Sequence, residues 1–396
     1  MSNQSRRNFM KTTVVGGAAL MMTPAWRMAE AQVAGRSVNR TIRGVGVAPG
    51  VVQISSNENP LGASPRAIEA VLRVMGSSNR YYRSPTLEIA IAEAYGLDYT
   101  PPRRVSRQPT EVGMILLAAG SGQVLHSLGL AYFENAGDEI VAAVPSYGSI
   151  ERSWEAYGGV VHRVPLKNYT HDLDGMLKKV HAGTKMVSIC NPNNPTGTIV
   201  PYNELEAFID AVPKSVLVVV DEAYVEFVAD DNYQTSISLA ASRENVISVR
   251  TFSKIFGLAG VRVGYAIAHP DINQKLSKYH YNNGISLYGK VAAEAALTDY
   301  SHQRNSRQLA IDVKQYFEEE FEALGLGYIR SESSFMLVNL KQDARPIGRA
   351  LQQRKISVSD AEGRWDMKGW IRVSVGTKEE SETFITALRE ILTSTL

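Results

Sequence analysis

Lys254 is the residue of this sequence whose surroundings most clearly favour chemistry over simple solvent exposure. It follows an apolar run and precedes Gly257 and Gly260, so we expect its amine in an irregular loop at the carboxyl edge of a sheet, where open α/β sheets bind ligands. Partial burial beside a second cation, here Arg262, lowers the pKa of a lysine, and a deprotonated amine can form a Schiff base. Ser253 and Arg262 can together hold a phosphate. Taken singly, Lys254 would be an ordinary surface lysine.

A carboxylate and a phenol follow another apolar run. Asp221 directly follows the run 216–220. The ordinary interpretation is that its carboxylate caps the next helix. The functional interpretation is a carboxylate that pairs with a protonated pyridine nitrogen, so that the ring stays cationic and withdraws electrons from a substrate carbanion. Tyr224 lies three residues further on and can donate a hydrogen bond to a phenolic oxygen of such a ring.

Two loops offer neutral donors. The segment 191–197 contains two prolines and a glycine, which fix a tight loop where the Asn194 amide can bond a phenolate without adding charge; a simple turn is the alternative. Ser121, Gly122 and Gln123 precede an apolar helical run, so their backbone N–H groups form a natural phosphate cradle at a helix N-terminus. A Gly-Ser-Gly segment is weak evidence by itself, and it gains meaning only from the motifs around it.

The order of these motifs makes the sequence resemble the fold-type I aminotransferases, most closely the histidinol-phosphate aminotransferase family. The resemblance covers essentially the whole chain after its first 31 residues. The segments that carry it are 57–62, 79–81, 145–148, 193–197, 221–224, 253–254 and 372–377. It implies an enzyme with pyridoxal 5'-phosphate as its cofactor, which moves an amino group between an amino donor and a 2-oxo acid acceptor.

The resemblance also implies roles around the cofactor ring. Lys254 is implied to be the Schiff-base lysine, which moves a proton between the substrate Cα and the cofactor C4'. Asp221 would bond the pyridine nitrogen, Asn194 and Tyr224 would bond the phenolic oxygen, and Tyr147 would stack on the ring. Lys254, Asp221 and Tyr224 are therefore the expected catalytic residues.

Further implied roles concern the phosphate, the substrate and a partner subunit. The residues implied to hold the phosphate are Ser121, Gly122 and Gln123 by backbone, Ser253 and Arg262 by side chain, and Thr251 as a weaker candidate. Arg372 and Asn57 are implied to bind the substrate, with Arg372 anchoring its anionic group. Tyr81 resembles the tyrosine that reaches into the neighbouring subunit's phosphate site, which implies a homodimer with shared active sites.

The sequence departs from the family pattern at two positions. Tyr82 stands where the family usually has proline, so the choice of Tyr81 over Tyr82 stays open. Ser359 stands where the family usually has an arginine that helps to bind the substrate phosphate. Arg364, in the following loop, could substitute, although a loop arginine is more often solvated. We therefore expect histidinol phosphate to be a poor donor.

Two other classes of function remain as alternatives. The first is an enzyme of the same fold and cofactor with another reaction, such as an oxidase, lyase, decarboxylase or racemase, because these share the cofactor motifs. The second is a non-catalytic binding protein. Lys254 with its full supporting set argues against that second alternative.

The elements that must position these residues follow an alternating pattern. Strands are expected at 139–144, 160–165, 185–190, 216–220, 245–249 and 261–268, with helical spacing between them at 173–181 and 204–211. Such alternation predicts an α/β fold with a mostly parallel sheet flanked by helices. A long helical stretch over 287–324, strands at 335–340 and 370–375, and helices at 346–354 and from 379 predict a smaller α+β module.

The expected domain organisation has four parts. Residues 1–31 match a twin-arginine signal peptide, with Arg6 and Arg7 before a short apolar stretch and Ala29 to Ala31 as the cleavage pattern. Residues 32–79 form an N-terminal arm and part of the small domain, 80–285 the large cofactor-binding domain, and 286–396 the C-terminal small domain. The enzyme is then periplasmic or exported, or cytoplasmic if the signal is not used.

Composition excludes several classes of function. The formal net charge of +2 over 396 residues is too small for a nucleic-acid-binding face. Cys190 is the only cysteine, which excludes an internal disulfide framework and a thiolate metal cluster, and no metal is expected. The apolar stretch Thr12 to Met22 is too short to span a bilayer as a helix, which needs ~20 residues, so no stable membrane insertion is expected.

Overall fold

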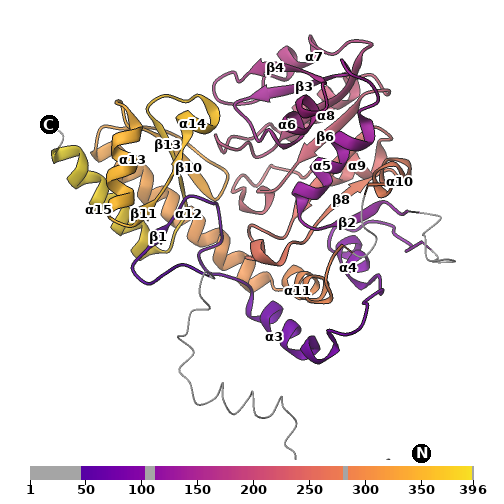
Figure 1. Ribbon diagram of the computed structural model, residues 1–396, viewed down its shortest axis with the longest axis horizontal. Coiled ribbons are helices and arrows are strands. Elements are labelled where there is room, and N and C mark those ends of the chain that lie inside the picture. The colour runs from indigo at the N-terminus through magenta and orange to yellow at the C-terminus, as the bar shows by residue number, and fades with distance from the viewer. Residues whose placement is uncertain (1–45, 103–111, 280–283, 395–396) are drawn as a thin grey trace, which may run out of the picture. The chain divides into compact units, whose positions relative to one another are not determined.

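A seven-stranded sheet formed within residues 115–268 is the central element of the structure (Figure 1). The computed structural model describes residues 46–102, 112–279 and 284–394, so the expected signal segment 1–31 lies outside the described residues. The strands, in their order across the sheet, are β2 (Ile115–Ala118), β8 (Gly264–Ala268), β7 (Val246–Thr251), β6 (Leu217–Asp221), β5 (Thr184–Cys190), β3 (Glu139–Val144) and β4 (Val160–Pro165). Only β8 runs antiparallel to its neighbours, which confirms the mostly parallel sheet that the sequence predicts.

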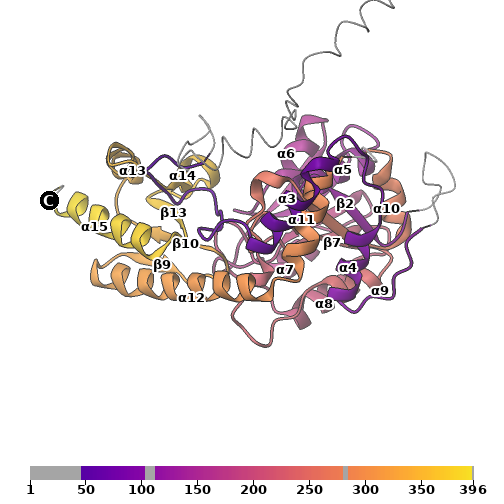
Figure 2. The same cartoon turned by 90° about the horizontal axis from the view of Figure 1, so that it is seen from below.

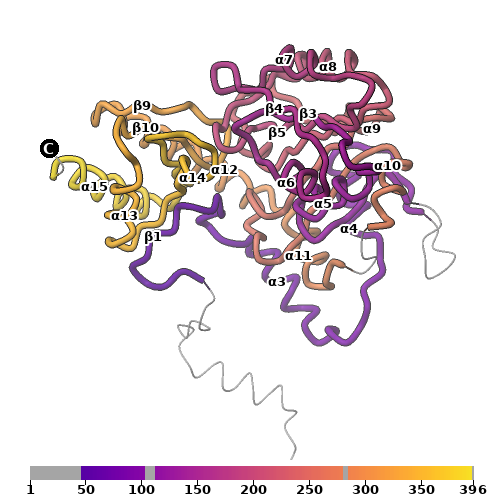
Figure 3. Tube along the Cα trace, turned by 45° about the horizontal axis from the view of Figure 1, so that its top comes forward, coloured from indigo at the N-terminus to yellow at the C-terminus, as the bar shows by residue number. Residues whose placement is uncertain are grey.

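Helices cover both faces of this sheet because its strands are apolar on both sides. Leu217 and Val219 belong to one core with α5 (Ser121–Tyr132), α6 (Ser149–Ala156) and α10 (Pro270–Ser277). Val218 and Val220 point to the opposite face, into a core shared with α4 (Thr86–Ala94), α8 (Tyr202–Ala211), α9 (Ile237–Ser242) and α11 (Leu287–Leu297). The short α7 (Leu173–Leu177) packs against α8, and α3 (Pro65–Val74) packs against α11. Figure 3 traces β3, β4 and β5 side by side.

The C-terminal part forms a second, smaller sheet. Its antiparallel strands, in order, are β12 (Ser359–Asp360), β13 (Trp370–Ser374), β10 (Phe335–Asn339) and β9 (Gly327–Ile329). The helices of this part are α12 (Tyr300–Ala323), α13 (Ala344–Gln353), α14 (Ala361–Trp365) and α15 (Lys378–Ser394). Figure 2 shows α12 beside α15, where Phe317 and Phe321 are fully buried. An early strand, β1 (Val52–Gln53), pairs in parallel with β11 (Ile356–Ser357), so residues near position 52 belong structurally with the C-terminal part.

Three local predictions are wrong. The stretch 287–324 is two helices, because Asp299 caps α12 by accepting a hydrogen bond from the His302 amide at 3.2 Å. Strand β8 begins at Gly264 and not at 261, because Ala259–Val261 form a 3-10 turn and Arg262 takes a left-handed conformation. Arg364 lies in the short helix α14 and not in a loop.

The predicted boundaries after residues 79 and 285 stay predictions. Contacts between residues place Gly50–Leu396 in one compact unit. None of the described helices is long and apolar enough to cross a membrane.

Candidate active site

The predicted site residues lie on loops at one edge of the large sheet. Strands β2, β3, β5, β6 and β7 end at this edge, and the antiparallel β8 begins there. The residues that follow or precede these strand ends, in chain order, are Ser121, Tyr147, Asn194, Asp221, Tyr224, Ser253, Lys254 and Arg262. Segments that are up to about 140 residues apart in sequence therefore meet, because parallel strands present their carboxyl ends together.

The first turn of α5 supplies backbone donors. Ser121, Gly122 and Gln123 open this 12-residue helix, and Gly120 precedes it with a φ of 84° that favours glycine. A Cβ on Gly264 of β8 would lie 2.4 Å from the Ser121 nitrogen, so only glycine lets β8 approach the helix start this closely. The unpaired N–H groups and the dipole of the helix make its N-terminus a binding place for an anion.

Arg262 and Ser253 stand beside this helix start. The left-handed backbone of Arg262, with φ 61°, turns its guanidinium back so that Nη1 donates to Ser253 Oγ at 3.4 Å and Nη2 to the Ala119 carbonyl at 3.4 Å. Thr251 Oγ1 donates to Ser253 Oγ at 2.9 Å. A cation, hydroxyls and a helix N-terminus thus surround one point, and this is a donor set suited to a phosphate.

Lys254 has no carboxylate partner at hydrogen-bond distance among the described residues. Its Nζ donates to the carbonyl oxygens of Asn57 at 3.1 Å and Ser56 at 3.4 Å, and lies 5.5 Å from the centre of the Tyr224 ring. Burial, followed by the positive charge of Arg372, lowers the pKa of Lys254 to about 8. A lysine with this pKa has a substantial deprotonated fraction near neutral pH, as a nucleophile or a general base requires.

Asp221 is buried at the end of β6, and its closest donor is the Ala223 amide at 3.2 Å. Burial raises the pKa of Asp221 to about 7, although the nearby charge of Lys254 acts in the opposite direction. Tyr147 is 41% exposed, and partial burial together with the Asp221 carboxylate raises its pKa. The carboxylate is therefore short of cationic partners, and a protonated ring nitrogen would supply one.

Asn57 connects Tyr224 to the end of β13. Its Nδ2 donates to the Tyr224 hydroxyl at 2.9 Å, and its Oδ1 accepts from Ser374 Oγ at 2.8 Å. The Asn57 backbone, with φ 53°, also donates to Ser374 Oγ at 2.9 Å. Burial raises the pKa of Tyr224, so this phenol stays protonated at neutral pH.

Arg372 is a buried cation, 3% exposed. Its Nη1 donates to Asn194 Oδ1 at 2.6 Å and its Nη2 to the Ser55 carbonyl at 2.9 Å. The guanidinium lies 5.1 Å from the Phe335 ring centre and 5.0 Å from that of Trp365. Burial lowers its pKa to about 10, and its Nε has no hydrogen-bond partner among the residues that the structure describes. No described carboxylate pairs with it, so the arginine is available to an anionic group.

The structure does not bring Tyr81 to this site within its own chain. Tyr81 is 77% exposed, and the Arg83 guanidinium lies 5.7 Å from its ring. Tyr82 instead shares a hydrogen bond with Thr86 Oγ1 at 2.8 Å, next to the first turn of α4. The choice between the two tyrosines, and the partner subunit that it implies, remain predictions.

Sequence reasoning missed the small polar residues that hold the site together. Ser55 and Ser56 bind Arg372 and Lys254 through their carbonyls, and Ser374 orients Asn57. Backbone carbonyls leave no signal in a sequence. Ser374 could have been found from the sequence, because it lies two residues after Arg372 in the same strand and therefore on the same face.

Fold and site together define an α/β enzyme of fold type I whose cofactor is pyridoxal 5'-phosphate. The chain belongs to the family of class I and II aminotransferases, whose family model matches residues 49–388. It is 38% identical to the histidinol-phosphate aminotransferase of Moorella thermoacetica, over 91% of this chain and 90% of that one. It is 34% identical to the enzyme of the same name from Caldicellulosiruptor saccharolyticus, over 91% of this chain and 97% of that one.

A solved structure of similar fold holds the cofactor. It is the histidinol-phosphate aminotransferase from Sinorhizobium meliloti in complex with pyridoxal 5'-phosphate, with a TM-score of 0.77 and 26% identity over 92% of this chain and all of that one. The residues of the present chain fit the same group. The helix start at Ser121 with Ser253 and Arg262 suits its phosphate, Asp221 suits its ring nitrogen, and the Lys254 amine suits its aldehyde. The bound cofactor supplies an electron sink for a carbanion at the substrate Cα.

Proposed function

We propose that this aminotransferase takes an ordinary amino acid as its donor and a 2-oxo acid as its acceptor, with Arg372 binding the α-carboxylate. The observation that carries the proposal is the residue opposite Arg372 in the small sheet. In the pairing of β12 with β13 that residue is Ser359, which is 3% exposed and whose hydroxyl has no hydrogen-bond partner in the described part of the chain. Directly paired residues of antiparallel strands point to the same face, so this hydroxyl lies on the Arg372 side of the sheet.

Charge matching favours a carboxylate over a phosphate ester at this place. A phosphate dianion removed from water usually needs more than one cation, because each charge-assisted hydrogen bond offsets part of its desolvation. Ser359 offers one neutral donor. Arg364 is exposed on α14, although its charge adds to the effect of burial in lowering the Arg372 pKa. One buried guanidinium with a neutral neighbour therefore suits a monoanion.

Each side chain of the site has a separate role in the proposed reaction. Lys254 would take the proton from the substrate Cα and deliver it to the cofactor C4', for which a pKa near 8 is suited. Asp221 would keep the ring cationic, and Tyr224, which Asn57 orients, would donate to the ring's phenolic oxygen. Arg372 would fix the substrate α-carboxylate and so restrict how the Cα can lie relative to the Lys254 amine.

A second candidate donor is histidinol phosphate, because relatives that are 34% and 38% identical carry that name. The two candidates are distinguished by kcat/KM for histidinol phosphate and for a panel of free amino acids, with 2-oxoglutarate and pyruvate as acceptors. We expect a free amino acid to exceed histidinol phosphate by at least about tenfold, roughly 1.4 kcal/mol in transition-state binding.

A matched pair of variants tests the reason for that preference. Ser359→Arg restores a second cation beside Arg372 and should raise kcat/KM for histidinol phosphate, while Arg364→Ala, which removes an exposed charge, should change it by less than about threefold. If histidinol phosphate is the best donor of the unaltered enzyme and Arg364→Ala abolishes its use, Arg364 completes a phosphate site and the proposal is wrong.

We further propose that the enzyme is exported in folded form and works as a homodimer. The support for export is the pattern around Arg6 and Arg7, which lies outside the described residues, and the support for the dimer is the exposed Tyr81. Replacing Arg6 and Arg7 by lysine should retain the protein in the cytoplasm of fractionated cells, whereas a periplasmic double variant or a wild type that never leaves the cytoplasm contradicts export. Sedimentation equilibrium measures the mass of the enzyme in solution and should give that of a dimer. A monomer that is fully active contradicts the homodimer.

A further inference from the structure

Three side chains outside the active site converge at the opposite ends of the parallel strands. Glu139 is the first residue of β3, His162 lies in β4, and His181 lies in the turn before β5. Glu139 is 23 residues before His162 and 42 before His181. This spacing matches no short metal-binding motif, so a metal site at these residues could not be expected from the sequence.

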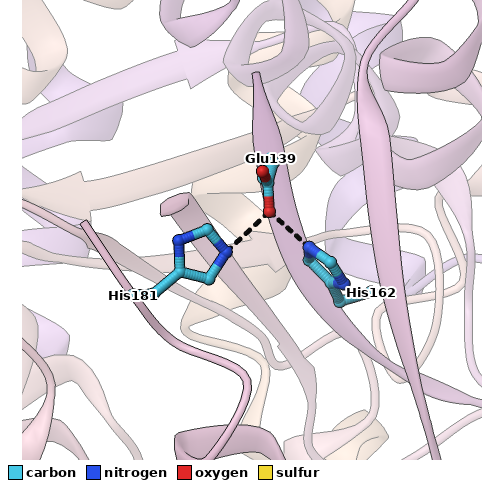
Figure 4. A group of neighbouring side chains, drawn as sticks. All are labelled: Glu139, His162 and His181. Carbon is cyan, nitrogen blue, oxygen red and sulfur yellow. Dashed lines mark hydrogen bonds and ion pairs between the residues drawn. The ribbon is translucent and has the colours of Figure 1, made fainter. Parts of the chain in front are cut away.

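The two imidazoles meet at a single carboxylate oxygen. Figure 4 shows both Nε2 atoms directed at the same oxygen of Glu139. His181 Nε2 lies 2.7 Å from Glu139 Oε2, and His162 Nε2 also contacts that oxygen. The three possible ligand atoms all lie within 4.8 Å of one another, and the two rings, with centres 5.7 Å apart, are inclined by 76°. The two imidazoles and the carboxylate therefore converge on one point from different directions.

Regular structure fixes each of these side chains. In the pairing of β3 with β4, His162 lies opposite Val141, and Val141 is on the same face as Glu139 because side chains alternate along a strand. His181 is held by Thr184, whose Oγ1 accepts from the His181 amide at 3.1 Å and whose own amide donates to the His181 carbonyl at 2.9 Å. Ligands placed on strands and a locked turn are pre-organised for binding.

The ligand types and spacing suit a borderline transition cation. Two imidazoles and one carboxylate are among the ligand sets that bind Zn²⁺, with bonds of about 2.0–2.2 Å in tetrahedral geometry and an open fourth position. Such bonds place ligand atoms roughly 3.3–3.5 Å apart, so the carboxylate must move back by less than about 1 Å from His181. The side chains are 26%, 32% and 49% exposed for Glu139, His162 and His181, which leaves room for water as a fourth ligand.

Binding also requires a change of tautomer at both imidazoles, because each Nε2 now donates to the Glu139 carboxylate. His181 Nδ1 now accepts from the Gly183 amide at 3.1 Å, so the ring proton sits on Nε2, facing Glu139. A cation needs the Nε2 lone pair, so the proton must move to Nδ1 and the Gly183 contact must be given up. The bond to the cation replaces a local hydrogen bond on a partly exposed turn, where the net contribution of such a bond is small.

We propose that Glu139, His162 and His181 form a site for a divalent transition cation of the Zn²⁺ class. The cation links three segments of the chain, which are β3, the edge strand β4 and the turn before β5. It lies at the amino ends of the strands, whereas the cofactor residues lie at their carboxyl ends, so its role is to stabilise the fold and not to take part in transamination.

The test uses the full chain without a histidine tag, loaded with its cofactor and freed of metal by chelation and dialysis. Titration calorimetry with Zn²⁺ and with Co²⁺ should show one site per chain. His162→Gln and His181→Gln should each weaken binding by at least about tenfold, while His126→Gln, a change at an exposed histidine of α5, should leave it unchanged. Zn²⁺ should raise the Tm of the wild type and of His126→Gln only, and all four proteins should retain transamination within about twofold.

A crystallographic measurement makes the test independent of variant folding. Crystals of the wild type soaked in Zn²⁺ should give an anomalous difference peak between Glu139, His162 and His181. The proposal is overturned if no peak lies there, if Zn²⁺ binds all variants equally, or if His162→Gln lowers the Tm by the same amount with and without Zn²⁺. That last result would mean that the three residues form only an ion cluster.

Discussion

The two titratable groups at the centre of the site are shifted in opposite directions by the same cause. Burial raises the pKa of Asp221 to about 7 and lowers that of Lys254 to about 8, because a low-dielectric environment disfavours whichever form is charged. Groups tuned toward neutrality in this way are typical of catalytic sites. Burial of these two ionisable groups therefore lowers the stability of the fold and at the same time brings their pKa values close to neutral pH.

Asp221→Asn separates the effect of this carboxylate on stability from its effect on catalysis. The folded pKa of Asp221 is raised above its unfolded value, so the ionised carboxylate destabilises the fold; the penalty is absent below about pH 4, grows with pH and is complete above about pH 7. Cofactor-free Asp221→Asn should therefore have a higher Tm than cofactor-free wild type at pH 8, and the difference should vanish near pH 4. Transamination should fall at least about 100-fold, roughly 2.7 kcal/mol.

Calorimetry and steady-state kinetics on the same preparations measure both quantities. An Asn variant that is less stable at pH 8, or one that loses less than about tenfold in rate, would show that Asp221 is a structural cap and that another group faces the ring nitrogen.

At the scale of elements, strands with continuous apolar runs were predictable and their irregular ends were not. The predicted strand 139–144 coincides with β3, and 160–165 with β4, because both runs are bounded by turn residues. The four-residue β2 was too short to be recognised as a strand before the helix start. Val261 and Val263 look like strand residues, yet the backbone between them turns left-handed to aim Arg262 at Ser253. Such long-range contacts decide the geometry and leave no local pattern.

The contact between β8 and the start of α5 gives a prediction about the phosphate cradle. A Cβ at Gly264 would lie 2.4 Å from the Ser121 nitrogen, 2.6 Å from the Gly120 carbonyl carbon and 2.9 Å from the Arg250 carbonyl oxygen. All three are backbone atoms, so Gly264→Ala must push the helix start away, with an expected overpacking cost of about 1–3 kcal/mol. We expect the Kd for pyridoxal 5'-phosphate to rise at least about tenfold and the Tm to fall.

Gly348→Ala is the matched control, because apart from the adjoining backbone of its own helix no atom of the described residues lies within 4 Å of the added Cβ, and alanine favours a helix. Cofactor affinity measured by fluorescence quenching should be unchanged in the control. Wild-type affinity in Gly264→Ala would mean that the helix start does not bind the phosphate.

For the whole molecule, the site depends on parts of the chain that are far apart in sequence. Asn57 comes from the segment that precedes α3, Asn194 and Asp221 from the large sheet, and Arg372 from the small sheet, yet hydrogen bonds of 2.6–2.9 Å connect Arg372 to Asn194 and Asn57 to Tyr224. The motifs predicted which residues would gather, because the order of these motifs resembles that of a known family. They could not predict that Arg372 would already bond Asn194, or that Ser359 would stand opposite it.

The central claim is that the Lys254 amine at the carboxyl edge of the sheet performs transamination, and Lys254→Ala tests it most directly. With cofactor-loaded protein and the best donor amino acid, the 2-oxo acid formed in a single turnover is measured for the wild type, for Lys254→Ala, and for Lys179→Ala as an exposed-lysine control. We predict stoichiometric product for the wild type and the control, and bound cofactor without detectable product for Lys254→Ala. Product formation by Lys254→Ala at the wild-type rate would contradict the account.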